Sequence, residues 1–214
     1  MPNRDLQDFR QDYSIASLEI EQCADSPFEQ FATWLNNAIK ANVIEPNAMS
    51  LATVDENLQP KVRTVLLKEF TIEGFVFYTN YESDKAKEMT FSNKVSLLFW
   101  WINTQQQIRI EGTVKKISET QSKAYFYSRP KGSQVGATVS PQSKIIVDRR
   151  ILDDLFDQKM QQYQDSEVPF PNNWGGYIVE PTYFEFWQGR SSRLHDRVAY
   201  QLENNSWKKV RLAP

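Results

Sequence analysis

The order of apolar and polar residues along the chain predicts several amphipathic helices. The clearest begins at Ser26-Pro27, a typical cap and first helical residue, and is followed by apolar residues three and four positions apart: Phe28, Phe31, Ala32, Leu35, Ala38 and Ile39. Helices are also predicted over 83–93, 119–128 and 148–163, and a short one over 6–13. We expect the helix after Ser26 to bury its apolar stripe in a core.

Between and after these helices, the chain carries short runs typical of β-strands. Strands are predicted over 49–54, 62–69, 75–79, 95–102, 107–117, 177–187, 193–202 and 207–212. Turn residues such as Asp, Asn and Gly fill several of the gaps, which favours antiparallel pairing. Many short strands with inserted helices indicate a β-rich α+β fold, an antiparallel barrel with peripheral helices.

Length and composition favour one domain preceded by an arm. The chain has 214 residues, of which 40% are hydrophobic and 13% aromatic, enough to form one well-packed core. We expect residues 1–25 to form a mobile N-terminal arm and residues 26–214 to form a single domain.

Charge and cysteine content narrow the classes of function. The formal net charge of -2 disfavours a nucleic-acid-binding barrel or a membrane-surface protein, so any anion site must be local. The single cysteine, Cys23, excludes an internal disulfide, and with a single histidine it predicts no metal site. The polar stretch Met1 to Tyr13 does not resemble a secretory signal, and the apolar run Leu97 to Ile102 is too short for a membrane span. We expect a cytoplasmic protein.

The only histidine lies in a row of cationic groups. If residues 193–197 are extended, Arg193, His195 and Arg197 project from one face at intervals of roughly 6.6 Å. Such a row favours a facing anion or electron-rich ring, although charges on an exposed strand edge would give the same pattern. Both interpretations stay open on spacing alone.

Three further sets of residues are candidates for anion binding. Arg63 and Lys68 bracket an uncharged strand, and Lys85 opens a helix whose N-terminus suits a phosphate. The third set, Tyr125, Arg129 and Ser133, recurs at four-residue intervals from a helix end into a glycine-containing loop. The alternatives are ordinary strand-end charges, a capped helix and cations that complement a helix dipole.

We find no catalytic triad, glycine-rich phosphate loop or carboxylate pair in the sequence. Anion-binding groups and aromatic residues without a nucleophile are typical of a protein whose reactive chemistry belongs to a bound cofactor.

Taken together, these segments resemble the pyridoxine/pyridoxamine 5'-phosphate oxidase family over nearly the whole chain. The segments that carry the resemblance are Arg63-Thr-Val-Leu-Leu-Lys68, Phe77-Tyr-Thr-Asn80, Tyr125-Phe-Tyr-Ser-Arg-Pro130 with Ser133-Gln134, Trp174-Gly-Gly176, Phe186-Trp-Gln-Gly189, Arg193-Leu-His-Asp-Arg197 and Arg211-Leu-Ala-Pro214. The resemblance implies an FMN-binding split β-barrel that forms a homodimer with sites at the subunit interface. It also implies a flavoprotein oxidoreductase of pyridoxine biosynthesis, which oxidises pyridoxamine 5'-phosphate or pyridoxine 5'-phosphate to pyridoxal 5'-phosphate with oxygen, releasing hydrogen peroxide.

The family's functional residues carry over by position. Those implied to contact FMN are Arg63, Thr64, Val65, Leu66, Leu67, Lys68, Tyr78, Thr79, Lys85, Gln107, Gln142, Ser143, Trp187 and Arg197. Those implied to hold the substrate phosphate are Lys68, Tyr125, Arg129 and Ser133. Arg193 and His195 are implied to lie against the substrate ring as catalytic residues, and Arg10 and Tyr13 to close over the site.

Two positions depart from the family pattern, and two rival functions stay open. Asp84 stands where the family often has arginine, and Gln11 stands where a basic residue is expected in the arm. The rivals are another split-barrel flavin reductase and a non-catalytic carrier of pyridoxal 5'-phosphate or flavin.

Overall fold

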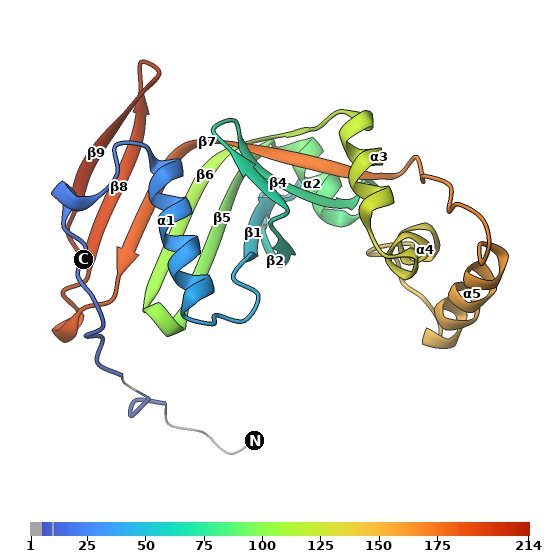
Figure 1. Ribbon diagram of the computed structural model, residues 1–214, viewed down its shortest axis with the longest axis horizontal. Coiled ribbons are helices and arrows are strands. Elements are labelled where there is room, and N and C mark those ends of the chain that lie inside the picture. Colours follow the sequence, from blue (N-terminus) through green and yellow to red (C-terminus); the bar gives the residue numbers. More distant parts are fainter. Residues whose placement is uncertain (1–5, 10) are drawn as a thin grey trace. The chain divides into compact units, whose positions relative to one another are not determined.

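The computed structural model describes residues 6–9 and 11–214 as an antiparallel β-structure with helices inserted along the chain (Figure 1). The α-helices are α1 (Pro27–Lys40), α2 (Asp84–Phe91), α3 (Glu119–Ser128), α4 (Lys131–Val139) and α5 (Arg149–Gln162). The strands are β1 (Ala48–Val54), β2 (Pro60–Leu66), β3 (Glu69–Thr71), β4 (Gly74–Asn80), β5 (Lys94–Trp101), β6 (Gln106–Lys116), β7 (Trp174–Gln188), β8 (Asp196–Glu203) and β9 (Ser206–Leu212).

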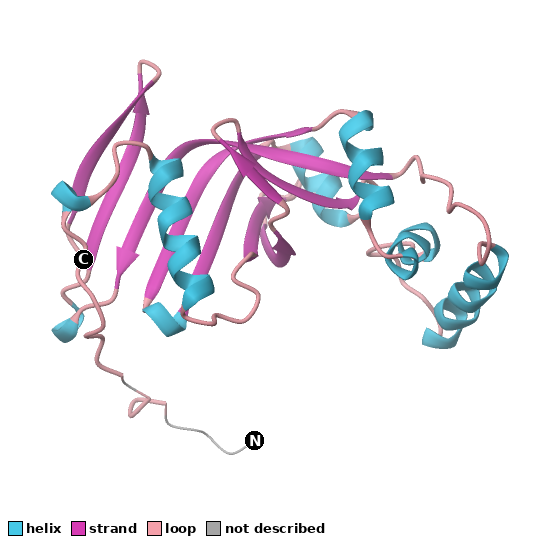
Figure 2. Cartoon of the chain, viewed as in Figure 1, coloured by secondary structure: helices cyan, strands magenta, loops and turns pink. Residues whose placement is uncertain are grey.

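Hydrogen bonding gives one strand order, β2-β1-β5-β6-β7-β4-β3, and β8 pairs with both β7 and β9. The pairs of β4 with β7, β7 with β8 and β8 with β9 are all antiparallel. Figure 2 distinguishes these strands from the helices between them. The prediction of a β-rich α+β fold is confirmed.

Three local predictions were wrong. The described part of 6–13 contains a turn at residues 7–8 and no helix. Residues 131–139 form α4 instead of continuing a glycine loop, because Pro130 occupies the N-cap position and a new helix begins directly after it. The strand predicted from Arg193 begins only at Asp196, because Ser192 and Arg193 adopt positive φ angles of 56° and 62° in a short turn.

The chain divides into two compact units, which we describe separately. The first unit comprises Met1–Met49, Leu97–Glu111 and Thr182–Pro214, and the second comprises Ser50–Ser96 and Gly112–Pro181. Strands β1, β5, β6 and β7 contribute residues to both. The single-domain prediction and the mobile arm stay predictions.

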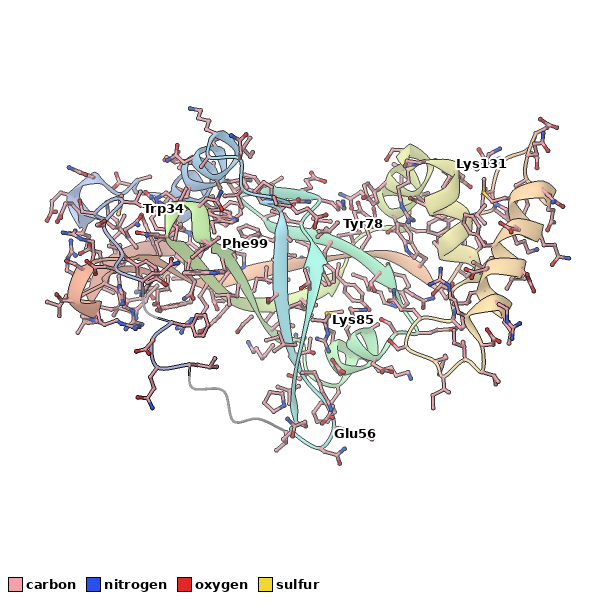
Figure 3. All side chains as sticks on the ribbon, turned by 90° about the horizontal axis from the view of Figure 1, so that it is seen from below. Trp34, Glu56, Tyr78, Lys85, Phe99 and Lys131 are labelled. Carbon is pink, nitrogen blue, oxygen red and sulfur yellow. The ribbon has the colours of Figure 1, made fainter. Side chains whose placement is uncertain are left out.

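The core of the first unit forms where α1 packs against strand residues. Phe31 and Trp34 contact Phe99 of β5 and Phe186 of β7, with ring centroids 5.2 Å apart in each pair. Figure 3 labels Trp34 and Phe99 in this unit. The helical apolar stripe is therefore buried as expected, although the Ser26 hydroxyl makes no capping hydrogen bond with any residue described.

Residues just before α1 also join the first unit. Leu18 is buried and its N–H donates to the carboxylate of Asp196 at 3.0 Å. Cys23 is buried as well, and burial raises the pKa of its thiol above the ordinary value. The last third of the predicted arm is therefore tied to the fold by both packing and hydrogen bonds.

The second unit has its own apolar cluster beneath α3, α4 and α5. Phe126, Val135, Val168 and Trp174 are buried in it, and Phe156 and Met160 of α5 pack against it. The start of α3 is fixed by a capping box, in which Ser118 and Gln121 exchange hydrogen bonds between side chain and backbone. Of the helices among the described residues, none is long and apolar enough to cross a membrane.

Two glycines of the second unit give a matched pair of substitutions. A Cβ at Gly112 of β6 would lie 2.2 Å from the carbonyl oxygen of Glu180, whereas a Cβ at Gly136 of α4 would meet nothing within 4 Å. We expect Gly112→Ala to lower the free energy of unfolding by about 1–3 kcal/mol, because backbone must move to admit the methyl group. Gly136→Ala should raise it by about 0.5–1 kcal/mol through helix propensity.

Urea denaturation of both variants checks this pair. Equal effects of the two substitutions would contradict the close approach of β6 and β7 at Gly112.

Candidate functional site

The second unit contains a cleft of about 520 Å³ that gathers most of the residues expected there. Its walls come from β2 and the residues just after it, β4, α2, α3, the α3–α4 junction, α4 with the segment that follows α4, and the first residue of β7. The lining residues are Thr64, Val65, Leu66, Lys68, Tyr78, Thr79, Lys85, Tyr125, Arg129, Pro130, Ser133, Gln142 and Trp174. Figure 3 labels Tyr78 and Lys85, which β4 and α2 contribute.

The charged residues that line this cleft are all cationic. Lys68, Lys85 and Arg129 supply three cations, and no carboxylate is found among its described lining residues. Cations gathered in this way repel one another, so an anionic ligand stabilises the arrangement. The cleft is therefore suited to phosphate groups.

Lys85 is held by neutral oxygen atoms at one end of the cleft. Its ammonium lies 3.0 Å from Gln142 Oε1 and 3.3 Å from Thr79 Oγ1, and the Thr79 hydroxyl donates to the same Gln142 oxygen at 2.8 Å. Burial lowers the pKa of Lys85, and the nearby charge of Arg63 lowers it further. An anion bound here would replace lost hydration and favour the charged form of Lys85.

Arg129 is partly desolvated at the other end. One of its terminal nitrogens donates to the Ser133 carbonyl at 2.8 Å, while the other, NH1, is buried without a partner among the described residues. Its guanidinium lies over the ring of Trp174, 4.7 Å from the centroid. Burial lowers the pKa of Arg129. A buried donor with no acceptor is costly unless a ligand supplies one.

Stacked aromatic rings form the floor of the cleft. The rings of Tyr78 and Tyr125 are 3.9 Å apart at an interplanar angle of 21°, and Trp174 lies 5.4 Å from Tyr78 at 12°. Tyr78 pairs with Gly176 across the sheet, where a Cβ would lie only 2.8 Å from the Tyr78 ring. Burial, and next the charge of Glu69, raises the pKa of Tyr78 to about 12, so this phenol stays neutral.

Six of the expected flavin-binding residues are absent from the cleft lining. Three of them, Gln107, Trp187 and Arg197, belong to the first unit, and three, Arg63, Leu67 and Ser143, belong to the second. The Arg63 guanidinium forms an ion pair of 2.5 Å with the buried carboxylate of Glu88 in α2 and also donates to Thr53. Leu67 is buried. Ser143 accepts a hydrogen bond of 3.3 Å from the backbone N–H of Asp84, at the start of α2.

The Asp84 side chain, a departure noted in the sequence, lies at that helix start. Its carboxylate is 3.7 Å from Lys87 Nζ, and both side chains are largely exposed. The carboxylate therefore faces a neighbour on its own helix and is not part of the cleft lining.

The first unit holds a second group of expected residues around His195. The imidazole ring lies 4.5 Å from the Trp187 ring and 5.9 Å from the Tyr13 ring. Its Nδ1 accepts a hydrogen bond of 3.1 Å from the backbone N–H of Arg190. Burial and the charge of Arg193 lower the pKa of His195, which favours the neutral ring with its proton on Nε2.

The Arg197 side chain is held by hydrogen bonds, whereas the Arg193 side chain is exposed. Arg197 donates to the buried carboxylate of Glu185 at 2.8 Å and to the Ala213 carbonyl at 2.7 Å. Arg193 is exposed and has no recorded hydrogen bond to the residues that the structure describes. The row of three cationic groups expected from an extended segment is therefore wrong in its geometry, because Arg193 lies in the turn. Gln107, on β6, is half-buried in the same unit.

Sequence reasoning gave most of the cleft but omitted several contributors. Trp174 and Pro130 line it, while Glu88 and Glu185 are buried partners of expected arginines. Trp174 had a usable signal, since it directly precedes a Gly-Gly pair. The buried acids had none, because nothing local distinguishes them from surface carboxylates. Arg10, expected in the arm, lies outside the described residues.

The cleft residues fit FMN together with a phosphorylated aromatic substrate. Lys85 with its neutral oxygen partners, and the unpartnered Arg129 nitrogen, offer two separate places for phosphate oxygens. The stacked rings offer an aromatic surface beside them.

Comparisons with known proteins point to one family. The family described as "Pyridoxamine 5'-phosphate oxidase" matches residues 35–162, and "Pyridoxine 5'-phosphate oxidase C-terminal dimerisation region" matches residues 174–214. The pyridoxine/pyridoxamine 5'-phosphate oxidase of Aliarcobacter butzleri is 51% identical over 98% of this chain and 100% of its own length. That of Trichormus variabilis is 46% identical over 99% and 100%.

Solved structures confirm the split-barrel fold. PhzG from Burkholderia lata, in complex with tetrahydrophenazine-1-carboxylic acid, superposes with a TM-score of 0.89 at 29% identity, covering 95% of this chain and 100% of that one. A pyridoxamine 5'-phosphate oxidase-related, FMN-binding protein from Nostoc punctiforme has a TM-score of 0.70 at 16% identity, covering 88% and 98%. On the sequence matches, the chain belongs to the pyridoxamine 5'-phosphate oxidase family.

Proposed function

We propose that this chain is an FMN-dependent oxidase that converts pyridoxamine 5'-phosphate or pyridoxine 5'-phosphate to pyridoxal 5'-phosphate, with oxygen as electron acceptor and hydrogen peroxide as by-product. The observation that carries the proposal is the cleft with three cations, stacked aromatic rings and no acid among its described lining residues. The curated relatives, 46–51% identical, bear the name of this activity.

FMN, when bound, supplies the acceptor for the hydride equivalent, which no amino-acid side chain can provide. The chain's own residues bind and orient. We assign Lys85, Thr79 and Gln142 to the flavin phosphate, since they already form a linked polar group. Arg63 and Ser143 keep the FMN contacts that the resemblance implies. The ion pair with Glu88 would fix the position of the Arg63 guanidinium.

Binding of the substrate phosphate is the role that we propose for four residues: Lys68, Tyr125, Arg129 and Ser133. Arg129 supports this assignment most directly, because its buried NH1 still needs an acceptor. Fixing the phosphate restricts the position of the reacting carbon, and orientation of this kind supplies a large part of a rate enhancement.

Arg193 and His195 are assigned to the substrate ring. The hydrogen bond to His195 Nδ1 leaves Nε2–H as a donor in the neutral ring, and the exposed Arg193 guanidinium is free to reach a ligand. Tyr13 would cover the site together with Arg10, while Trp187, Gln107 and Arg197 would contact the flavin.

We also propose a cytoplasmic homodimer with sites at the subunit interface. The match of residues 174–214 to a dimerisation region supports the dimer. The lone cysteine, left as a free thiol, is typical of proteins in a reducing compartment.

The visible spectrum of the purified protein tests the function. FMN-loaded protein should lose its flavin absorbance near-stoichiometrically on anaerobic addition of pyridoxamine 5'-phosphate and recover it, with peroxide release, on admission of air. A carrier would show no bleaching. Bleaching only by a reduced nicotinamide nucleotide, or only by an oxidisable carboxylic acid that lacks a phosphate, would support another flavin reductase or oxidase.

Arg129→Ala should mainly affect binding of the phosphorylated substrate. We expect the Michaelis constant for pyridoxamine 5'-phosphate to rise at least about tenfold, because a desolvated charge-assisted contact is lost. Steady-state kinetics measure this, and the FMN content should match wild type. An unchanged Michaelis constant would remove Arg129 from the phosphate site.

Lys85→Gln should weaken binding of the FMN phosphate. Titration of apoprotein is expected to show an FMN dissociation constant raised about tenfold or more, with riboflavin affinity within about twofold of wild type. Lys87→Gln, which changes an exposed lysine of the same helix, is the matched control. Equal losses for FMN and riboflavin would assign Lys85 a structural role only.

A further inference from the structure

Lys131 lies in the sequence between Arg129 and Ser133, two of the residues proposed to bind the substrate phosphate. Its own side chain instead binds backbone carbonyls near the end of α5. Its ammonium donates to the backbone carbonyls of Tyr163, Gln164 and Ser166 at 2.6, 2.8 and 3.2 Å. Tyr163 is the C-cap of α5, and the other two residues follow it. Figure 3 labels Lys131 in the second unit.

These three contacts use the full donor capacity of the ammonium. A lysine has three N–H donors, so Lys131 has none left for a ligand anion. The carbonyls at the C-terminal end of a helix lack intrahelical partners and carry partial negative charge. Lys131 therefore joins the start of α4 to the end of α5 by an interaction that is both directional and electrostatic.

A second contact joins the same two helices next to this one. A Cβ at Gly132 would lie 3.7 Å from the ring of Phe156, so α5 packs directly against the first turn of α4. Phe156 and Met160 continue this packing onto the cluster that contains Val135 and Trp174. The apolar contact and the ammonium contact thus restrain the backbone at positions 131 and 132.

The restrained backbone belongs to a tight turn that carries the phosphate-binding groups. Arg129 donates to the Ser133 carbonyl at 2.8 Å, and Gln134 Nε2 donates to the Arg129 carbonyl at 2.7 Å. The Ser133 N–H donates to the Pro130 carbonyl at 2.8 Å. A displacement of Lys131 would therefore move Arg129 and Ser133 together.

We infer that Lys131 is a positioning residue for the substrate-phosphate site: by binding the carbonyl of the α5 C-cap and two carbonyls of the segment that follows it, Lys131 holds Arg129 and Ser133 at the spacing that a phosphate needs. On this inference, α5 restrains the backbone of that site. The inference rests on the proposed function, because it concerns the phosphate that the function places there.

The test compares ligands that differ only by the phosphate. In FMN-loaded Lys131→Met, we expect affinity for pyridoxal 5'-phosphate to fall about tenfold, because Arg129 and Ser133 would no longer be held at the spacing that binds the phosphate, while affinity for pyridoxal stays within about twofold. The Michaelis constant for pyridoxamine 5'-phosphate should rise to a similar extent, with turnover changed much less. Calorimetric titration and steady-state kinetics measure the two effects.

Two further variants separate positioning from general stability. Lys159→Met makes the same chemical change on α5. The Lys159 ammonium donates to the Gln162 side chain at 2.8 Å and lies 5.6 Å from the centroid of the Tyr163 ring, so both contacts stay at the end of α5, and this variant should leave both affinities unchanged. Lys131→Arg keeps donors for the same carbonyls and should retain most of the affinity for pyridoxal 5'-phosphate. If Lys131→Met does not fold, Lys131→Gln replaces it, with a smaller loss in the same direction.

Equal losses for pyridoxal 5'-phosphate and pyridoxal, or no loss for either, would overturn the inference. A wild-type protein that binds pyridoxal as tightly as pyridoxal 5'-phosphate would instead contradict the proposed function itself, so the two failures are distinguishable.

Discussion

The chemistry of the second unit depends on cations that are removed from water without acidic partners in the cleft. Lys85 is neutralised by no carboxylate there and is held by a hydroxyl and an amide oxygen, while one Arg129 nitrogen has no partner among the described residues. Desolvation raises the free energy of each charged group, and a bound anion would offset that increase. Acids in the same unit, such as Glu88, are used to anchor Arg63 and do not line the cleft.

The backbone prepares this arrangement before any ligand is considered. Glycines at 175 and 176 leave space for aromatic side chains beside the first residues of β7, and Tyr78 of β4 uses that space to stack with Tyr125 and Trp174. A hydrogen-bonded turn then places Arg129 over the Trp174 ring. Strand pairing and side-chain stacking therefore set the distance between the two cationic ends of the cleft.

The sequence predicted element types and cleft membership better than it predicted local geometry. The helix predicted over 119–128 is observed with the same bounds, and a local capping box of Ser118 and Gln121 fixes its start. Arg129 and Ser133 both line the cleft, as the sequence predicts, but residues 131–139 form a helix where Gly132, a poor helix former, favours a loop. The Arg63–Glu88 pair joins residues 25 positions apart, and only tertiary packing brings such residues together.

Burial of Cys23 has a consequence for the proposed reaction. Each turnover with oxygen would release peroxide, an oxidant that attacks thiolates far faster than protonated thiols. The raised pKa of Cys23 keeps the sulfur protonated at neutral pH, and the surrounding fold limits access to it. Sulfenic acid formation, the first step of oxidative damage at cysteine, is thereby disfavoured in a protein that would generate its own oxidant.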